Sequence, residues 1–277
     1  MLFIVATPIG NREDITLRAQ RVLREVAIIA AEDTRHTGQL LAYYGIHARY
    51  LSLHEHNERD RAAAIIARLD AGDDVALVSD AGTPLIADPG ARLVAAARDA
   101  GHRVVPIPGP SSMLAAVVAS GLVTGPFTFV GFLPPKQGAR RAALEAIRAL
   151  PHPVVLFEAP HRIAATVADA LDVLGDRTCA LCRELTKLHE EIVVTTLAAA
   201  AEQFAQRPPR GEYVVVVAEA PVSTEVADDA AVDALLRVLL ESGLSSAAAA
   251  KEAATRTGVD RGACYKRAIA VKRVMTA

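Results

Sequence analysis

The chain contains no tryptophan, only three cysteines among 277 residues, and no long uninterrupted hydrophobic segment. No apolar run approaches the length of roughly 20 residues that spans a bilayer, which excludes a transmembrane helix. The first residues lack the basic flank of a signal peptide, so we expect none. Three cysteines cannot form a disulfide framework. Together with the missing export signal, they lead us to expect reduced cysteines and a cytoplasmic protein.

Metal-binding cysteine motifs are also scarce. Cys179-Ala180-Leu181-Cys182 matches C-x-x-C, but on a predicted strand its two thiols would point to opposite faces. We therefore interpret both as buried cysteines. His54 and His56 could share one face of an extended segment, but no cysteine or third histidine lies nearby in sequence. We expect no metal.

The first predicted strand is followed by a segment that is poor in glycine. Thr7-Pro8-Ile9-Gly10-Asn11 has one glycine where a dinucleotide-binding protein carries three, and Pro8 has no backbone amide. This argues against a pyrophosphate cradle, and hence against NAD, and favours a ligand without phosphates.

Acidic and basic residues nearly balance, with a formal net charge of −2. The distribution along the chain is uneven, because residues 251–277 hold seven lysines and arginines against two acidic residues, a net charge of +5. Such a basic segment is typical of nucleic-acid binding, although it would also suit a solubilising tail.

Short β-branched runs alternate with alanine-rich helical stretches in the first half of the chain. Strands are predicted near residues 2–6, 27–30, 75–78 and 104–107, with helices between them, which is the pattern of a parallel sheet covered on both faces. From residue 127 several connections are too short for a crossover helix, so we expect a mixed sheet with antiparallel pairing.

Three helices without any strand are predicted at residues 226–241, 245–257 and 261–274, with Gly243 and Gly258 as the breaks between them. Ser245-Ser246 would cap the second helix, and the last two helices have the spacing of a helix-turn-helix. The predicted organisation is therefore an α/β protein of two sheet domains followed by a small all-helical one. The boundaries are 1–124 for the N-terminal α/β domain, 125–220 for the second, and 221–277 for the helical domain.

The most informative segment is residues 79–90, which follows a buried strand at 75–78. It carries Asp80 and Thr83 together with two glycines and two prolines, which favour a rigid loop with unusual backbone angles. We interpret Asp88 and Pro89 as the N-cap and first position of the next helix. Polar groups thus gather beyond the carboxyl end of a strand, where open α/β sheets bind ligands.

The residues of this loop resemble a signature of the ribosomal RNA small subunit methyltransferase I family, within the tetrapyrrole methylase superfamily. The sequence departs from that family at Ala87, where a small polar residue is usual. Further motifs similar to the family occur in its order at residues 6–11, 31–35, 54–58, 108–112, 131–134, 158–162, 183–187 and 211–214.

The resemblance implies a methyltransferase with the superfamily's two-domain fold that uses S-adenosylmethionine, bound in a cleft between the domains. It also implies 2′-O-methylation of a cytidine in small-subunit (16S) ribosomal RNA, and a homodimer. The ligand roles that it implies fall on Ile9, Asp80, Thr83, Ser112, Met113 and Phe157.

Charged residues at predicted strand ends supply candidates for proton transfer and for contacts to RNA. We take Arg35, Glu158 and Lys187 as catalytic. We expect the pairing of Glu184 with Lys187 to lower the proton affinity of the lysine too little to make it a base. Contacts to RNA are assigned to Asp33, His161, Arg162, Lys266 and Arg267.

Two alternatives remain at this point. The same fold could methylate a tetrapyrrole carbon in corrin or sirohaem synthesis, although the basic tail and the charged clusters argue against it. A DNA-binding regulator with a small-molecule sensor domain is the other, but it needs neither the many polar loops nor catalytic groups.

Overall fold

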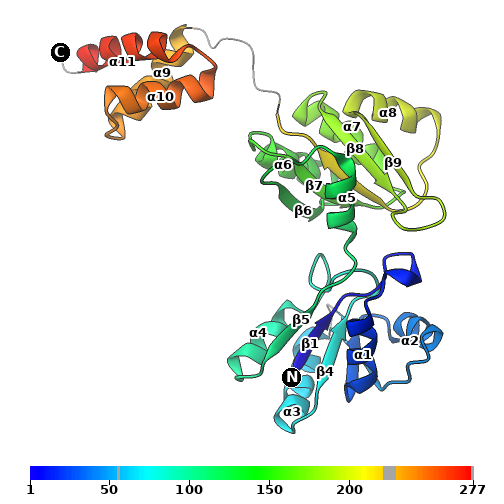
Figure 1. Ribbon diagram of the computed structural model, residues 1–277. Coiled ribbons are helices and arrows are strands. Elements are labelled where there is room, and N and C mark those ends of the chain that lie inside the picture. Colours follow the sequence, from blue (N-terminus) through cyan, green and yellow to red (C-terminus); the bar gives the residue numbers. More distant parts are fainter. Residues whose placement is uncertain (55–56, 221–228, 276–277) are drawn as a thin grey trace. The chain divides into compact units, whose positions relative to one another are not determined.

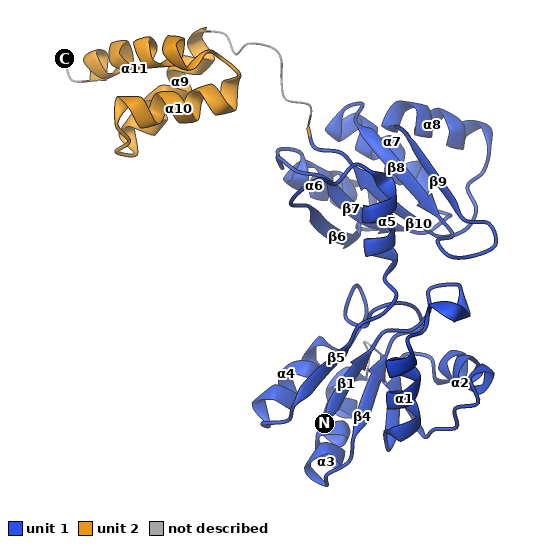
Figure 2. Ribbon diagram, in the orientation of Figure 1, with its two compact units in different colours: residues 1–219 blue, residues 220–277 orange. Residues whose placement is uncertain are grey.

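The computed structural model describes residues 1–54, 57–220 and 229–275, and it divides into two compact units. Unit 1 is Met1–Glu219 and unit 2 is Ala220–Ala277 (Figures 1 and 2). Unit 1 contains two five-stranded sheets, whose strand orders are β3-β2-β4-β1-β5 and β6-β7-β10-β8-β9. We refer to them as the first sheet and the second sheet.

The first sheet is parallel throughout. Its strands are β1 (Leu2–Val5), β2 (Ile28–Ala31), β3 (Tyr50–Ser52), β4 (Val75–Val78) and β5 (Val104–Ile107). The 3-10 helix η1 (Arg12–Asp14) follows β1, and the α-helices are α1 (Leu17–Glu25), α2 (Thr34–Tyr43), α3 (Glu58–Asp70) and α4 (Ala91–Asp99).

Two hydrophobic clusters cover the faces of this sheet. Residues of α1 and α2 pack on one face, among them Leu23 and Leu41. Residues of α3 and α4 pack on the other, among them Ile65 and Leu93. This sandwich explains why the central strand β4 is apolar and buried at every position.

The second sheet is mixed. Its strands are β6 (Thr128–Phe132), β7 (Val154–Glu158), β8 (Thr178–Arg183), β9 (Glu191–Thr196) and β10 (Tyr213–Val217). Strands β6 and β7 are parallel, whereas β10 is antiparallel to β7 and β8, and β8 is antiparallel to β9. This pairing confirms the predicted mixed sheet.

Helices also cover both faces of the second sheet. The core of one face includes residues of α6 (Gln137–Ile147), α7 (Ile163–Leu174) and α8 (Leu197–Gln206). On the other face lies α5 (Ser112–Ser120), which follows β5 of the first sheet but packs against β7 and β10 (Figure 1). The chain therefore passes to the second sheet before residue 112, although the three-domain division places residues 112–124 in the first domain.

The cysteines of the C-x-x-C pair are buried on opposite faces of β8, as predicted. Cys179 belongs to the core beneath α7 and α8, and Cys182 to the core beneath α5. Burial raises the pKa of the Cys179 thiol to about 12 and that of Cys182 to about 11, so neither is a ready nucleophile.

The sequence-based prediction missed one strand and placed one helix start wrongly. Strand β3 was not predicted, because it has only three residues, which are only partly buried. Asp88 and Pro89 do not begin the helix that follows them. Gly90, at φ +124°, is the N-cap of α4, and a conformation with so positive a φ is open to glycine and strained for other residues.

Unit 2 consists of α9 (Asp229–Glu241), α10 (Ser246–Thr257) and α11 (Arg261–Met275) around a small apolar core. Ser245 caps α10 by accepting a hydrogen bond from Ala248 N, and Gly258 ends the helix in the left-handed region. Both features agree with the predicted breaks. The predicted start of the first helix, at residues 226–228, lies outside the described residues.

Candidate active site

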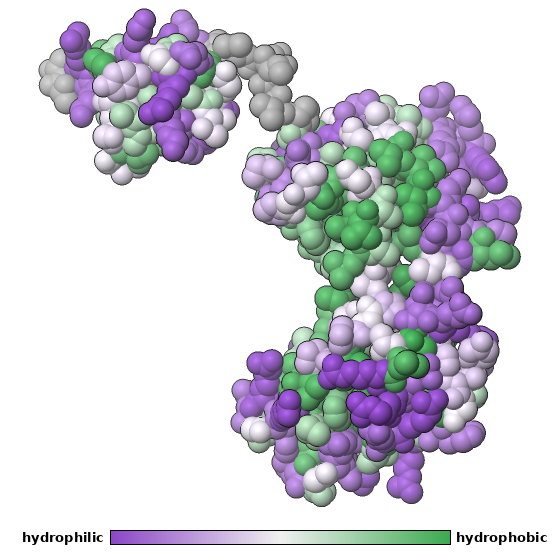
Figure 3. Space-filling view, viewed as in Figure 1, coloured by the Kyte–Doolittle hydropathy of each residue, from purple (hydrophilic) through white to green (hydrophobic). Residues whose placement is uncertain are grey.

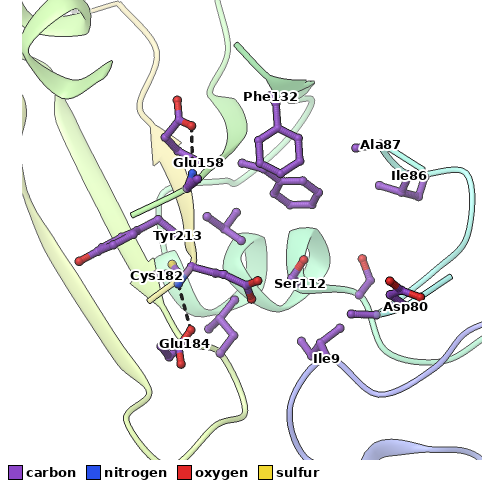
Figure 4. A pocket seen from close by; sticks show the side chains of 18 of the residues that line it. Ile9, Asp80, Ile86, Ala87, Ser112, Phe132, Glu158, Cys182, Glu184 and Tyr213 are labelled. Carbon is purple, nitrogen blue, oxygen red and sulfur yellow. Dashed lines mark hydrogen bonds between the residues drawn. The ribbon is translucent and has the colours of Figure 1, made fainter. Parts of the chain in front are cut away.

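A cavity of about 500 Å³ lies between the two sheets of unit 1, a volume within the range of roughly 300–1,000 Å³ that is usual for small-molecule sites. One side is formed by segments that follow strands of the first sheet, with Ile9, Asp80, Thr83 and Ser112 among them. The opposite side is formed by strand ends and loops of the second sheet (Figure 4).

The loop at residues 79–90 is fixed at its beginning by hydrogen bonds. Thr7 and Gly82 exchange backbone hydrogen bonds of 2.9 and 3.0 Å. The Ser79 hydroxyl donates to Gly82 O at 3.3 Å, and the Thr83 hydroxyl donates to Pro110 O at 3.0 Å. These contacts tie the loop to the segments after β1 and β5, so the three strand ends form one surface.

A buried carboxylate fixes the other end of the loop. Glu58, with 8% of its surface exposed, accepts hydrogen bonds from Gly90 N at 3.1 Å and Arg92 N at 2.9 Å. It thereby caps the N-terminus of α4 from the first turn of α3. Between the two anchors, Leu85 and Ala87 hold positive φ angles, at 74° and 68°. Such angles are unfavourable for non-glycine residues and persist only where the surroundings enforce them.

Acidic side chains dominate this side of the cavity. Asp80 accepts a hydrogen bond from Asp33 N at 3.1 Å, which joins the loop to the start of α2. Asp88 lines the cavity, and its pKa is raised to about 6, first by burial and then by the negative charge of Glu32. Among the described lining residues that come from the first sheet's segments there is no lysine or arginine.

The opposite side carries paired charges. Lys187 Nζ lies 2.9 Å from Glu184 Oε1 and 2.8 Å from Glu212 Oε2. Burial lowers the pKa of Lys187, but the two carboxylates outweigh it and raise the pKa overall. The expectation that this pairing would slightly lower the lysine's proton affinity was therefore wrong in sign, because two anions favour the charged ammonium.

The loop that holds Lys187 is itself constrained. Glu184 and Thr186 have positive φ angles of 50° and 65°. The Thr186 hydroxyl accepts a hydrogen bond of 3.0 Å from Asn11 N, across the cavity's edge. A side chain at Gly10 would collide with Lys187 Cγ. The glycine therefore allows the segment after β1 to approach this loop closely.

Aromatic and buried acidic groups complete the second side. The rings of Phe132 and Phe157 meet edge to face with centroids 5.6 Å apart, and both line the cavity (Figure 4). Glu158, 1% exposed, accepts hydrogen bonds from the Thr166 hydroxyl at 2.6 Å and from Ala159 N at 2.9 Å. Arg162 Nε lies 3.1 Å from the same carboxylate.

The structure brings most of the predicted residues of unit 1 to this cavity. Those that line it are Ile9, Asp80, Thr83, Ser112, Phe157, Glu158, His161 and Lys187. Met113 is not among them and packs in the core beneath α5.

Three other predicted residues do not line the cavity. Asp33 caps α2 by accepting hydrogen bonds from Arg35 N and His36 N. Arg35 pairs with Asp33 at 3.3 Å, and its side chain is 89% exposed. Arg162 pairs with Glu158 and donates a hydrogen bond to Leu133 O.

The two predicted residues of unit 2 lie on α11. Lys266 is exposed. Arg267 pairs with Asp229 and Asp233 of α9, which raise the pKa of its guanidinium.

Sequence reasoning did not assign Asp88, Phe132 or Glu212 to the site. Asp88 was interpreted as a helix cap, but α4 begins after Gly90 and Asp88 lines the cavity. The segment around Glu212 was recognised as a motif, which was the available signal for that residue.

Among the described residues, no group of three or more histidine, cysteine, aspartate or glutamate side chains could hold a metal ion. The predicted pair His54 and His56 cannot be compared, because residues 55–56 lie outside the described residues. No described helix is both long and apolar enough to cross a membrane.

A two-sheet α/β fold with a cavity between the sheets, acidic on one side, defines the class to which the chain belongs. Residues 1–201 match the family model of tetrapyrrole (corrin/porphyrin) methylases, so the chain belongs to that family. Residues 226–272 match the RsmI C-terminal HTH domain, which confirms the predicted helix-turn-helix.

Close relatives narrow the assignment. The chain is 47% identical to ribosomal RNA small subunit methyltransferase I of Mesorhizobium japonicum, over 98% of this chain and 92% of the relative. It is also 47% identical to the protein of that name from Pseudomonas aeruginosa, over 97% of this chain and 96% of that relative. The chain therefore belongs to the ribosomal RNA small subunit methyltransferase I family, as the motifs predicted, and the predicted class of enzyme, a methyltransferase, is confirmed.

Solved structures agree in fold. The methyltransferase CobJ superposes with a TM-score of 0.61 at 18% identity, covering 79% of this chain and 94% of its own. Uroporphyrin-III C-methyltransferase from Thermus thermophilus, complexed with S-adenyl homocysteine, superposes with a TM-score of 0.57 at 20% identity. The match covers 79% of this chain and 97% of that structure. These similarities confirm the predicted fold class.

Proposed function

We propose that this protein transfers a methyl group from S-adenosylmethionine to the 2′-hydroxyl of a cytidine in small-subunit (16S) ribosomal RNA. The observation that carries the proposal is the cavity with one acidic side and one side of paired charges, in a chain that is 47% identical to ribosomal RNA small subunit methyltransferases I. A tetrapyrrole substrate is less well supported, because uroporphyrin-III-C-methyltransferase from Thermus thermophilus is only 21% identical to this chain, against 47% for the ribosomal RNA methyltransferase of Mesorhizobium japonicum.

The first sheet's side of the cavity fits the cofactor. S-adenosylmethionine carries an ammonium and a sulfonium, and Asp80 and Asp88 offer carboxylates to these positive groups. Ile9, Phe132 and Phe157 offer apolar surface to the adenine. When bound, the cofactor supplies an electrophilic methyl group, and this chain's residues hold it and exclude water from it.

The second sheet's side fits the acceptor. In the reaction the S–CH₃ bond breaks as the O–CH₃ bond forms, the sulfur keeps the bonding electrons, and the hydroxyl releases its proton to water. We assign to the Lys187 ammonium the stabilisation of the oxygen as its negative charge develops. Lys187 does not take the proton, since its raised pKa keeps it charged. We assign to Glu158 a positioning role on the second sheet's side of the cavity. Its carboxylate accepts hydrogen bonds from Thr166 and Ala159 and pairs with Arg162, so it holds these groups in place.

Contacts to RNA are assigned to the exposed His161 of unit 1 and to unit 2, where Lys266 is exposed on α11. The engagement of Arg35 and Arg162 in ion pairs makes them weaker candidates than the sequence indicated. The three-domain division likewise stays a proposal, with residues 221–277 as the RNA-binding domain.

We also propose a cytoplasmic homodimer. Exposed apolar side chains gather on the face of the second sheet that carries α5, where Figure 3 shows a hydrophobic surface. They include Val118, which is 78% exposed, and Val194 of β9, which is 52% exposed. A patch of this kind favours a protein interface. Sedimentation of the Val194→Glu variant should show a monomer if this face joins two copies, and an unchanged mass would refute this interface.

Mapping 2′-O-methylated nucleotides tests the function directly. Small-subunit ribosomal RNA from cells that lack the gene should lose methylation at one cytidine, and a plasmid copy should restore it. An identical methylation map with and without the gene would contradict the proposed reaction.

A further inference from the structure

A second hollow lies on the face of the second sheet that carries α8, beside the end of that helix. Most of its lining side chains are polar or charged, among them Arg183, Glu191, Arg207, Arg210 and Tyr213. Its three arginines oppose one glutamate, which leaves a local charge of +2. At about 60 Å³ it has room for roughly two water molecules. It therefore suits a small charged group rather than a whole nucleoside.

Local packing holds the arginines around this hollow. Arg183 is the last residue of β8, and its Nε donates to Glu191 Oε2 of β9 at 3.0 Å, which orients the guanidinium. The segment 207–210, which includes two prolines, follows α8, and both Arg207 and Arg210 are exposed. Proline limits the backbone freedom of such a connection, so it restrains the positions of these two arginines.

The hollow adjoins the active-site cavity through shared chain segments. Tyr213 lines both. Arg183 directly precedes Glu184, and Arg210 lies two residues before Glu212. These two glutamates hold Lys187 at the acceptor side of the cavity. A polymer whose reacting ribose lies beside Lys187 would extend past this edge, where its next anionic groups meet the arginines.

We propose that this hollow binds the phosphodiester backbone of the RNA substrate, beside the nucleotide that is methylated. The inference rests on the proposed function. The guanidinium is suited to this role because its planar set of donors matches the oxygens of a phosphate. Contacts of this kind set the register of the RNA without reading its sequence.

The test compares two double variants of the full chain. Arg207→Ala/Arg210→Ala removes the two exposed arginines of the hollow. Arg98→Ala/Arg103→Ala removes two exposed arginines near the amino end of β5, at the edge of the first sheet opposite to the cavity. Binding of a 16S ribosomal RNA transcript is measured at several salt concentrations, alongside the affinity for S-adenosylmethionine and the melting temperature.

We expect the variant in the hollow to bind RNA several-fold more weakly and to flatten the logarithmic salt dependence by about 1.4 units, roughly 0.7 for each lost phosphate contact to a single strand. Cofactor affinity and melting temperature should be unchanged, and the control variant should behave like the wild type. Equal salt slopes for the two variants would overturn the inference. A wild-type protein that neither binds nor methylates the transcript or the small subunit would instead refute the proposed function.

Discussion

The two sides of the active-site cavity differ in how they handle charge. The first sheet's side presents Asp80 and Asp88, and among its described lining residues no lysine or arginine balances them. On the second sheet's side, Lys187 pairs with both Glu184 and Glu212, and Arg162 pairs with Glu158. Carboxylates without a basic partner favour a cationic ligand, whereas a network of ion pairs holds its groups in fixed positions. The proposed function divides the labour accordingly, with cofactor binding on the first side and activation of the acceptor on the second.

The largest effect is expected at Lys187. Replacing it with alanine removes the positive charge that we propose stabilises the acceptor oxygen, so methyl transfer at saturating cofactor should fall by roughly 10²–10³. Single-turnover transfer of labelled methyl groups to ribosomal RNA measures this, and Lys187→Arg should recover part of the rate. Full activity of the alanine variant would remove Lys187 from the reaction.

Variants of Asp80 test the proposed cofactor binding on the first sheet's side of the cavity. Asp80→Ala should weaken binding of S-adenosylmethionine by about 1.5–3 kcal/mol, the value of one charge-assisted hydrogen bond. Asp80→Asn keeps an acceptor for Asp33 N but removes the charge. Calorimetry on both variants therefore separates loop anchoring from attraction to the cofactor. Wild-type affinity in both folded variants would place the cofactor elsewhere.

Variants of Glu58 test whether cofactor binding requires the hydrogen bonds that fix the end of the loop at residues 79–90. Glu58→Ala removes the acceptor for Gly90 N and Arg92 N, which should cost about 1 kcal/mol of stability and also raise the KM for the cofactor without changing that for RNA. Glu58→Gln should restore the KM. Thr196→Ala, which removes the cap of α8, is the matched control. A similar rise in KM in that control would mean that the effect reflects general stability.

The smallest effect concerns pH. The pKa of Asp88 is raised to about 6 in the folded chain. The protonated carboxyl therefore stabilises the folded state, and this contribution is largest when the pH lies below the ordinary pKa of 3.8. That contribution is lost as pH rises from about 4 through 6. Above pH 6 the carboxylate is charged, so the ratio of affinities for S-adenosylmethionine over its uncharged-sulfur product should rise a few-fold. The Asp88→Asn variant should show a flat ratio, and a wild-type ratio independent of pH would exclude Asp88 from contact with the sulfonium.

Much of this architecture could be predicted from the sequence. The buried runs of β1 and β4 and the cap Ser245 are local signals, and the structure places these strands and α10 accordingly. Asp80 and Thr83 could be assigned to the site because polar residues that follow a buried parallel strand meet at one sheet edge.

What could not be predicted depends on contacts between distant residues. Asp88 before Pro89 has the local pattern of a helix cap, but Glu58, 32 residues from Gly90, caps α4 instead and leaves Asp88 to the cavity. The ion pairs of Arg162 and Arg267 are likewise set by packing between elements. For that reason the sequence alone could not distinguish arginines held by the fold from those available to RNA.

The division of labour can be tested in one experiment on Asp80→Asn and Lys187→Ala side by side. For each variant, the dissociation constant of S-adenosylmethionine and the single-turnover rate of methyl transfer to ribosomal RNA at saturating cofactor are measured. We predict that Asp80→Asn weakens cofactor binding with a nearly normal rate, and that Lys187→Ala binds the cofactor normally with a greatly reduced rate. Loss of both properties in both variants would contradict the assignment of separate roles to the two sides.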